Sequence, residues 1–265
     1  MGSTGRSKGK WESKKKGDSV KVFASTDIGR CRESNQDCFY YSTESVGNLP
    51  NLFLVADGMG GHNAGDYASK CTVVHMVSLI DAELIRTPVQ ILHNVIRKVN
   101  RLLIEQAYMD ASLRGMGTTL VAATIVRDEL VVANIGDSRL YVIEDTIRQI
   151  TKDHSYVEEM VRLGRMERGC EEYRKKKNII TRAIGANSTI QADYFHVPLQ
   201  EDSQILICTD GLTNMVDDET IRQIIQSDAP IEERGSSLIA LANENGGMDN
   251  ITVVLIDRKE RDTSC

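Results

Sequence analysis

Five aspartates in this 265-residue sequence lie at or near the ends of predicted strands, most of them beside glycine. In "LFLVADGMGGH" (52–62) an apolar stretch runs into Asp57 and then into three glycines within four positions. A strand end holds a ligand rigidly, and glycine lets the backbone turn tightly and approach a bound ion. The carbonyl of Gly58 is therefore a candidate ligand too. The other four aspartates are Asp37 in "ESNQD", Asp137 in "VVANIGDSR", Asp210 in "ILICTDG" and Asp249 in "GGMDNITVV".

These residue types suit metal-assisted attack on a phosphate ester. Carboxylates buried together repel one another, and some would take up protons unless cations balance them. Oxygen donors suit two or three Mg²⁺ or Mn²⁺ ions, whereas Zn²⁺ favours His and Cys. Two such ions about 3.5–4 Å apart share a water, lower its pKa and direct it at phosphorus. Arg32, five residues before Asp37, adds a guanidinium that can hold a phosphate through two bonds.

The alternative for each aspartate is a turn or capping role, which is the commoner role of a single Asp at a strand end. The recurrence of the pattern at five strand termini favours the metal site over five unrelated turns.

The elements that must position these residues are strands and helices in mixed order. Strands are predicted at 20–26, 52–56, 118–126, 129–135, 139–143, 147–150, 203–210 and 251–256. One helix starts at Ala64, with Ala64, Ala68, Cys71 and Val74 on its buried face. Others start at Thr87, as the N-cap of a capping box, after Asp217, and at about 229. Because short turns link the middle strands, we expect an α+β fold with antiparallel sheets and outer helices.

Composition fits one large globular domain, with 41% apolar and 26% charged residues. We expect residues 1–17 to be a disordered basic tail or a remnant of recombinant expression, residues 18–258 to form the domain, and 259–265 a short tail.

The net charge is −6 although residues 1–17 are basic, so the rest of the chain is acidic, which argues against a nucleic-acid partner. The sequence has no apolar run long enough to span a membrane. Its six cysteines include no C-x-x-C pair, which indicates free thiols in a reducing cytoplasm.

Other phosphate chemistries lack their motifs. No cysteine is followed by arginine six residues later, which excludes that cysteine-phosphatase signature, and there is no G-x-x-x-x-G-K-[ST] loop. The segment "GMGGHN" departs from G-x-G-x-x-G at its last position.

The ordered motifs resemble a known family. They are "RCRESNQD", "VADGMGGHNAGDYAS", "GMGTTLVAA", "ANIGDSRLY", "TKDHSYVEEMVRLG", "NIITRAIG", "CTDGLTNMV" and "GGMDNITVVLI". Over about residues 18–257 the chain resembles the metal-dependent protein serine/threonine phosphatases, protein phosphatase type 2C, in their compact bacterial form. The resemblance implies a four-layer α-β-β-α sandwich with two central antiparallel sheets, and a flap at about 153–180.

The resemblance also implies a role for each site residue. Two core Mn²⁺ or Mg²⁺ ions, bridged by a water that attacks phosphorus, would be held by Asp57, the carbonyl of Gly58, Asp210 and Asp249. Asp137 matches the position of a third ion, Asp37 would accept a hydrogen bond from water on the metals, and Arg32 would hold the phosphate. The implied substrates are phosphoserine and phosphothreonine proteins, which makes the enzyme the counterpart of a serine/threonine kinase; we expect a cytoplasmic monomer. The alternative is a catalytically dead module of the same fold that binds phosphoproteins.

Three positions depart from many relatives in the family. Met59 stands where eukaryotic members have a histidine proposed as general acid, and the role of nearby His62 stays open. Gln36 replaces a glutamate just before Asp37. Asn214 stands where some members offer an aspartate to the third ion, so we expect a third site that is weak or completed by water.

Overall fold

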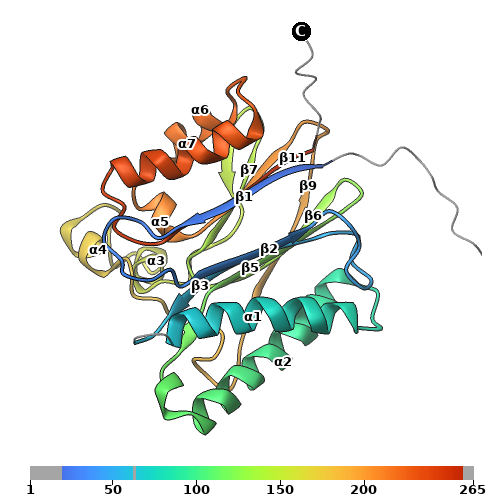
Figure 1. Cartoon of the computed structure of the whole chain (residues 1–265). Coiled ribbons are helices and arrows are strands. Elements are labelled where there is room, and N and C mark those ends of the chain that lie inside the picture. The colour runs from blue at the N-terminus through green and yellow to red at the C-terminus, as the bar shows by residue number, and fades with distance from the viewer. Residues whose placement is uncertain (1–19, 62–63, 259–265) are drawn as a thin grey trace, which may run out of the picture.

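The computed structural model describes residues 20–61 and 64–258, and two antiparallel sheets form its centre (Figure 1). The predicted tails at 1–17 and 259–265, and His62, lie outside the described residues. One sheet has the order β1-β11-β10-β7-β8 and the other the order β2-β3-β5-β6-β9, with β4 beside β3. All the strand pairings are antiparallel.

The two sheets are built from strands with the following bounds. The first sheet contains β1 (Lys21–Asp27), β7 (Arg139–Ile143), β8 (Ile147–Gln149), β10 (Gln204–Cys208) and β11 (Ile251–Asp257). The second contains β2 (Asp37–Ser42), β3 (Leu52–Met59), β4 (Gly117–Thr118), β5 (Leu120–Val126), β6 (Glu129–Ile135) and β9 (Asp193–Pro198).

Helices cover the outer face of each sheet (Figure 1). Helices α1 (Ala64–Asp81) and α2 (Pro88–Met109), followed by the 3₁₀ turn η1 (Ala111–Leu113), lie on the second sheet. Helices α5 (Asp210–Thr213), α6 (Asp218–Ile225) and α7 (Ile231–Glu244) lie on the first. Two short helices, α3 (Tyr156–Arg162) and α4 (Glu171–Lys176), belong to the connection between β8 and β9.

Three apolar cores lie between the four layers of helices and sheets. The inner core joins the facing sides of the two sheets and contains residues such as Phe53, Leu140 and Val254. Each outer core joins one sheet to its helices. Because β3 is buried on both faces, its apolar run does not alternate with polar residues. The predicted α-β-β-α sandwich is therefore confirmed.

Local details correct the sequence predictions. Val74 is 63% exposed, because the buried face of α1 instead carries Thr72, Val73 and Met76. Thr87 occupies the N-cap of α2, with Pro88 first in the helix, but the side-chain bond of a capping box does not form. Asp210 does not end a strand: β10 stops at Cys208, and Asp210 opens α5.

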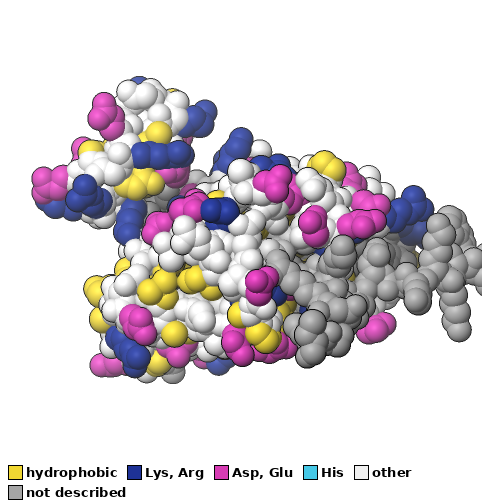
Figure 2. All heavy atoms as spheres, turned by 90° about the horizontal axis from the view of Figure 1, so that it is seen from above, with side chains coloured by type: hydrophobic (Ala, Val, Ile, Leu, Met, Phe, Trp, Pro, Cys, Tyr) yellow, Lys and Arg dark blue, Asp and Glu magenta, His cyan; other side chains and the backbone are white. Residues whose placement is uncertain are grey.

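The connection with α3 and α4 forms a lobe beside the sandwich. We call residues 153–180 the flap. Its two roots meet in an isolated β-bridge between Ser155 and Ile180. In Figure 2 the lobe stands off from the body of the molecule at the left end, the end where Figure 1 places α3 and α4.

Candidate metal centre

The five aspartates come from segments of both sheets and lie close enough for their charges to act on one another. Helix α5, which opens with Asp210, lies at the same end of the sandwich as the flap helices α3 and α4 (Figure 1). Asp37 and Asp57 are direct partners in the antiparallel register of β2 and β3. Asp210 and Asp249 flank β10 and β11 of the other sheet, and Asp137 lies on the turn that crosses from β6 to β7. Their charges act on one another: Asp57 is influenced by each of the other four. The structure therefore brings together all five aspartates that the sequence singled out.

The backbone around Asp57 is fixed on both sides. Its N–H donates to Thr119 Oγ1 at 2.9 Å, and its carbonyl accepts the Thr119 N–H and the Thr118 hydroxyl, each also at 2.9 Å. The next residue must be glycine, because a Cβ on Gly58 would lie 2.0 Å from the Gly65 carbonyl oxygen of α1. Close contact between β3 and the start of α1 thus sets the position of this pair.

Asp37 is held by two threonines of the opposite sheet. Its Oδ2 accepts from Thr252 Oγ1 at 2.6 Å and from Thr209 Oγ1 at 2.9 Å. Burial raises the pKa of Asp37 to about 7, against the effect of these two bonds, and the charges of Asp210 and Asp249 add to the rise. The bonds leave Oδ1 of Asp37 without a partner among the described residues.

Asp210 and Asp249 each bind a side-chain nitrogen. Asp210 Oδ2 accepts from Asn214 Nδ2 at 2.9 Å, one turn along α5. Asp249 Oδ2 pairs with Arg32 Nη2 at 2.7 Å, with the arginine side chain 51% exposed and the aspartate 25%. Burial and the neighbouring charge of Asp249 raise the pKa of Asp210 to about 6. Arg32 thus lies at the predicted site, where it pairs with a carboxylate.

Asp137 is held by a buried turn. Gly136 has φ +99°, and a Cβ there would come within 2.5 Å of Thr119 Cγ2, so the turn requires glycine. The hydroxyls of Thr119 and Ser138 lie 2.7 Å apart and join the turn to the residue that precedes β5. Burial raises the pKa of Asp137 to about 8, with further increases from the charges of Asp210 and Asp153.

The donor set fits hard divalent cations. Buried oxygens of Asp37, Asp137 and Asp210 have no hydrogen-bond partner among the described residues. Burial and mutual repulsion also raise the pKa of Asp57 well above its usual value. A cation at these oxygens would supply both the missing partner and the missing charge, and oxygen donors are those that Mg²⁺ and Mn²⁺ prefer.

The carboxylates are not all turned toward one point. Over residues 20–61 and 64–258, no three or more His, Cys, Asp or Glu side chains are already arranged to hold an ion. The bonds described above give the reason: Arg32 holds Asp249, Asn214 holds Asp210, and two threonines hold one oxygen of Asp37. Side-chain rotation at these residues would have to accompany binding.

Sequence reasoning missed several residues that position the site. The side chain of Asn250 accepts the Gln36 N–H at 2.8 Å and donates to the carbonyls of Ile28 and Ser34 at 2.9 and 3.0 Å. It thereby ties the loop that carries Arg32 to the start of β11. The "DN" pair in "GGMDNITVV" could have pointed to Asn250, but only the aspartate of this pair was predicted to have a function. Thr209 and Thr252 also lie within sequence motifs in which only the aspartates were predicted to have a function.

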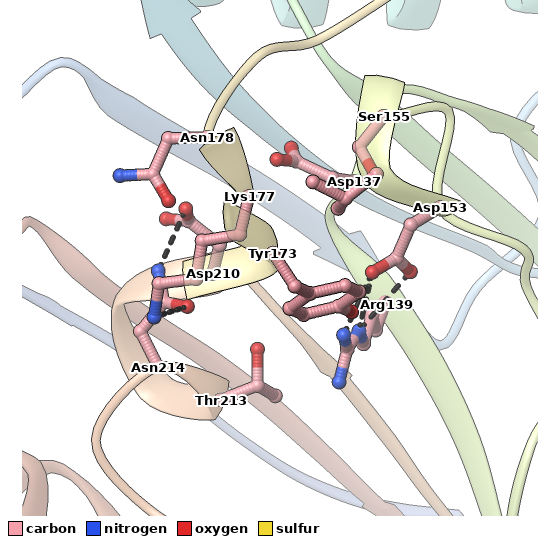
Figure 3. Close-up of a pocket in the computed structure, with 11 residues that line it drawn as sticks. Asp137, Arg139, Asp153, Ser155, Tyr173, Lys177, Asn178, Asp210, Thr213 and Asn214 are labelled. Carbon is pink, nitrogen blue, oxygen red and sulfur yellow. Dashed lines mark hydrogen bonds and ion pairs between the residues drawn. The ribbon is translucent and has the colours of Figure 1, made fainter. Parts of the chain in front are cut away.

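A pocket of about 180 Å³ lies between the centre and the flap (Figure 3). Asp137 and Asp210 line it on the side of the sandwich, and Tyr173, Lys177 and Asn178 on the side of the flap. Arg139 and Asp153 also line the pocket, and Arg139 binds both oxygens of Asp153, with its shortest bond at 2.7 Å. This pair joins β7 to the first residue of the flap.

This chain is similar to a protein family of known activity. The family model for protein phosphatase 2C matches residues 30–259. The serine/threonine phosphatase stp of Listeria welshimeri is 41% identical over 251 residues, covering 90% of this chain and 98% of that protein. Among solved structures, the serine/threonine phosphatase PstP/Ppp of Mycobacterium tuberculosis has a TM-score of 0.81 at 32% identity, covering 91% of this chain and 99% of that one. The catalytic domain of PstP in complex with two manganese ions has a TM-score of 0.79 at 34% identity, covering 90% and 97%.

This chain belongs to the protein phosphatase 2C family. It is a phosphatase, and the predicted family is confirmed. In the part of the chain that the structure describes, helices long and apolar enough to cross a membrane are absent.

Proposed function

We propose that this enzyme hydrolyses phosphoserine and phosphothreonine in proteins at a binuclear Mn²⁺ or Mg²⁺ centre. Asp57, the carbonyl of Gly58, Asp210 and Asp249 would hold the two ions. The observation that carries the proposal is the convergence of five aspartates from the ends of two sheets, where three of these aspartates have a buried oxygen without a partner among the described residues. When bound, the ions supply a water of lowered pKa as nucleophile and neutralise charge on the phosphoryl group.

Arg32 would bind the phosphate of the substrate. Its guanidinium has five N–H donors and is half exposed at the mouth of the site, so it can form two parallel bonds to phosphate oxygens. It donates to Asp249 through Nη2, which leaves its other donors available to a substrate.

Asp37 would orient the attacking water. Thr209 and Thr252 fix its Oδ2, and its Oδ1 has no partner among the described residues, so Oδ1 is the atom that can accept a hydrogen bond or a proton. Without bound cations, burial raises the pKa of Asp37 to about 7; two neighbouring cations would lower this pKa and keep Oδ1 available as a hydrogen-bond acceptor.

The proposal extends to the setting of the enzyme. Its substrates would be phosphoproteins made by a serine/threonine kinase, and the enzyme would act as a cytoplasmic monomer. Cys31, Cys38, Cys71, Cys170 and Cys208 are free thiols, which suits a reducing compartment.

The test is phosphate release from phosphoserine and phosphothreonine peptides with Mn²⁺, with and without a chelator. We expect turnover that the chelator abolishes. Asp249→Asn should lose more than about 100-fold in kcat/KM, because even indirect partners of a metal contribute about 10–100-fold. Asp145→Asn, an exposed change in the β7–β8 turn, is the control. Lack of turnover with any phosphopeptide at saturating metal would instead support the catalytically dead binding module.

A further inference from the structure

The flap carries an ammonium group into the pocket beside the metal centre. Lys177 follows the last residue of α4, and its Nζ donates to Asn214 Oδ1 at 2.7 Å (Figure 3). The same pocket is lined by Asp137 and Asp210. A positive charge from the flap thus lines the same pocket as Asp137, the residue that the family resemblance matches to a third ion.

Asn214 connects this ammonium to the metal centre. Lysine can only donate, so the amide oxygen of Asn214 must face Lys177, and the amide nitrogen then faces a carboxylate, Asp210 Oδ2, at 2.9 Å. This arrangement fixes which way the amide points. An aspartate at position 214 could accept from Lys177 but could not donate to Asp210, so the asparagine is matched to the lysine.

Lys177 is the flap cation that acts on Asp210, whereas the cation that acts on Asp137 is Arg139. Arg139, the other cation that lines the pocket, pairs with Asp153. Farther into the flap, Glu158 pairs with Arg168 and accepts from the Tyr173 hydroxyl. Lys177 bonds to a neutral amide, and its charge lowers the pKa of Asp210 against the effect of burial. Across the pocket, Oδ1 of Asp137 has no partner among the described residues.

We propose that the Lys177 ammonium supplies, at Asp210, the positive charge that a third divalent ion in this pocket would otherwise supply, and that it weakens binding of such an ion. This inference rests on the proposed binuclear function. A third ion in the pocket would be repelled by Lys177 and would lack the carboxylate that Asn214 replaces. Because the ammonium belongs to the flap, the charge at this site depends on the position of the flap.

The experiment counts Mn²⁺ ions bound by the full chain, from free Mn²⁺ measured by electron paramagnetic resonance. We expect the wild type to bind two ions and a third only weakly. Lys177→Met keeps the length of the side chain but removes the charge. It should tighten the third site at least about tenfold, because a unit charge within about 4–6 Å shifts such equilibria by about one to three powers of ten. Lys177→Arg should behave as the wild type.

Two further variants locate the site. Adding Asn214→Asp to Lys177→Met should tighten the third site again, and adding Asp137→Asn should remove the gain. Thermal melting checks that each variant is folded.

Equal affinity for the third ion in the wild type, Lys177→Met and Lys177→Arg would overturn the inference while leaving the two core ions in place. Absence of the two core ions in the wild type would instead overturn the proposed function. The two failures are therefore distinguishable.

Discussion

At the scale of single residues, the site consists of acids in an environment that disfavours their charge. Burial raises the pKa of Asp37, Asp137 and Asp210 to about 7, 8 and 6, from an ordinary value of 3.8. Each also has an oxygen without a partner among the described residues. Buried acids that have raised pKa values and an unpartnered oxygen do not favour the stability of the fold, but they are well suited to bind a cation.

Stability should therefore depend on pH in an unusual direction. When a chelator has removed metal ions, these acids stay protonated in the folded protein over much of the range between about pH 4 and 8. The same acids are ionised in the unfolded chain over this range. The free energy of unfolding should fall as pH rises from 5 to 8, by about 3 kcal/mol for one group of pKa near 7.

Urea titrations in EDTA at several pH values measure this dependence. Mn²⁺ should restore the stability lost at pH 8, and Asp137→Asn should flatten the curve. A free energy of unfolding that rises over this range would contradict the account of the acids.

Arg32 should matter through its geometry as well as its charge. Arg32→Ala removes both phosphate bonds and should lower kcat/KM on phosphopeptides by about 10²–10³-fold, the usual cost of losing a charge-stabilising donor. Arg32→Lys keeps the charge but loses the two-pronged contact, so it should recover only part of the activity. Steady-state kinetics, with the exposed Arg86→Ala as control, provide the measurement; a kcat/KM unchanged by Arg32→Ala would remove Arg32 from the site.

At the scale of elements, strand ends were predictable where the strands were buried. The runs before Asp57 and after Asp249 are apolar on both faces, so composition alone revealed them. Strands β2 and β9 were missed: both are edge strands, half-buried, and β9 ends in proline, so neither shows a clear period. The sequence singled out Asp37, but it did not predict that Asp37 is the first residue of β2 and the register partner of Asp57.

The flap depends on a histidine at its root. The ring of His154 accepts the Gly136 N–H at Nδ1, 3.1 Å away, and its Nε2 lies 3.2 Å from Asp193. Burial lowers the pKa of His154, which keeps Nδ1 available as an acceptor. His154→Ala would leave the buried Gly136 N–H unpaired, at a cost of about 1–3 kcal/mol.

We expect His154→Ala to speed proteolytic cleavage within residues 153–180 and to weaken binding of ions that need Asp137. His196→Ala, an exposed histidine on β9, is the matched control. Equal cleavage rates in the two variants would show that His154 does not anchor the flap.

At the scale of the whole molecule, the site exists because two sheets end at the same place. Each sheet packs on its own helices, and both contribute aspartates to one end of the sandwich. Antiparallel pairing was predictable from the hairpin-linked middle strands. Two side-chain contacts, that of Arg32 with Asp249 and that of Lys177 with Asn214, could not be predicted. They join residues that are distant in sequence, and the hydrophobic periodicity of the sequence does not determine where these polar side chains point.

The outer layer should be energetically separable from the site. Arg234 of α7 and Asp257 of β11 form an ion pair with side chains 2% and 8% exposed. Arg234→Ala would leave Asp257 buried without its cation and should cost about 3–5 kcal/mol. Thermal or urea unfolding would detect the loss, with the exposed Lys70→Ala as control. Mn²⁺ affinity of the folded variant should be unchanged; a large loss would show that α7 supports the metal centre.

The most direct test of the account is an anomalous-difference map from crystals grown with Mn²⁺. We expect two strong peaks next to Asp57, among the Gly58 carbonyl, Asp210 and Asp249, and the loss of both in Asp57→Ala crystals. Peaks only at other places in an enzyme that is active under the same conditions would contradict it.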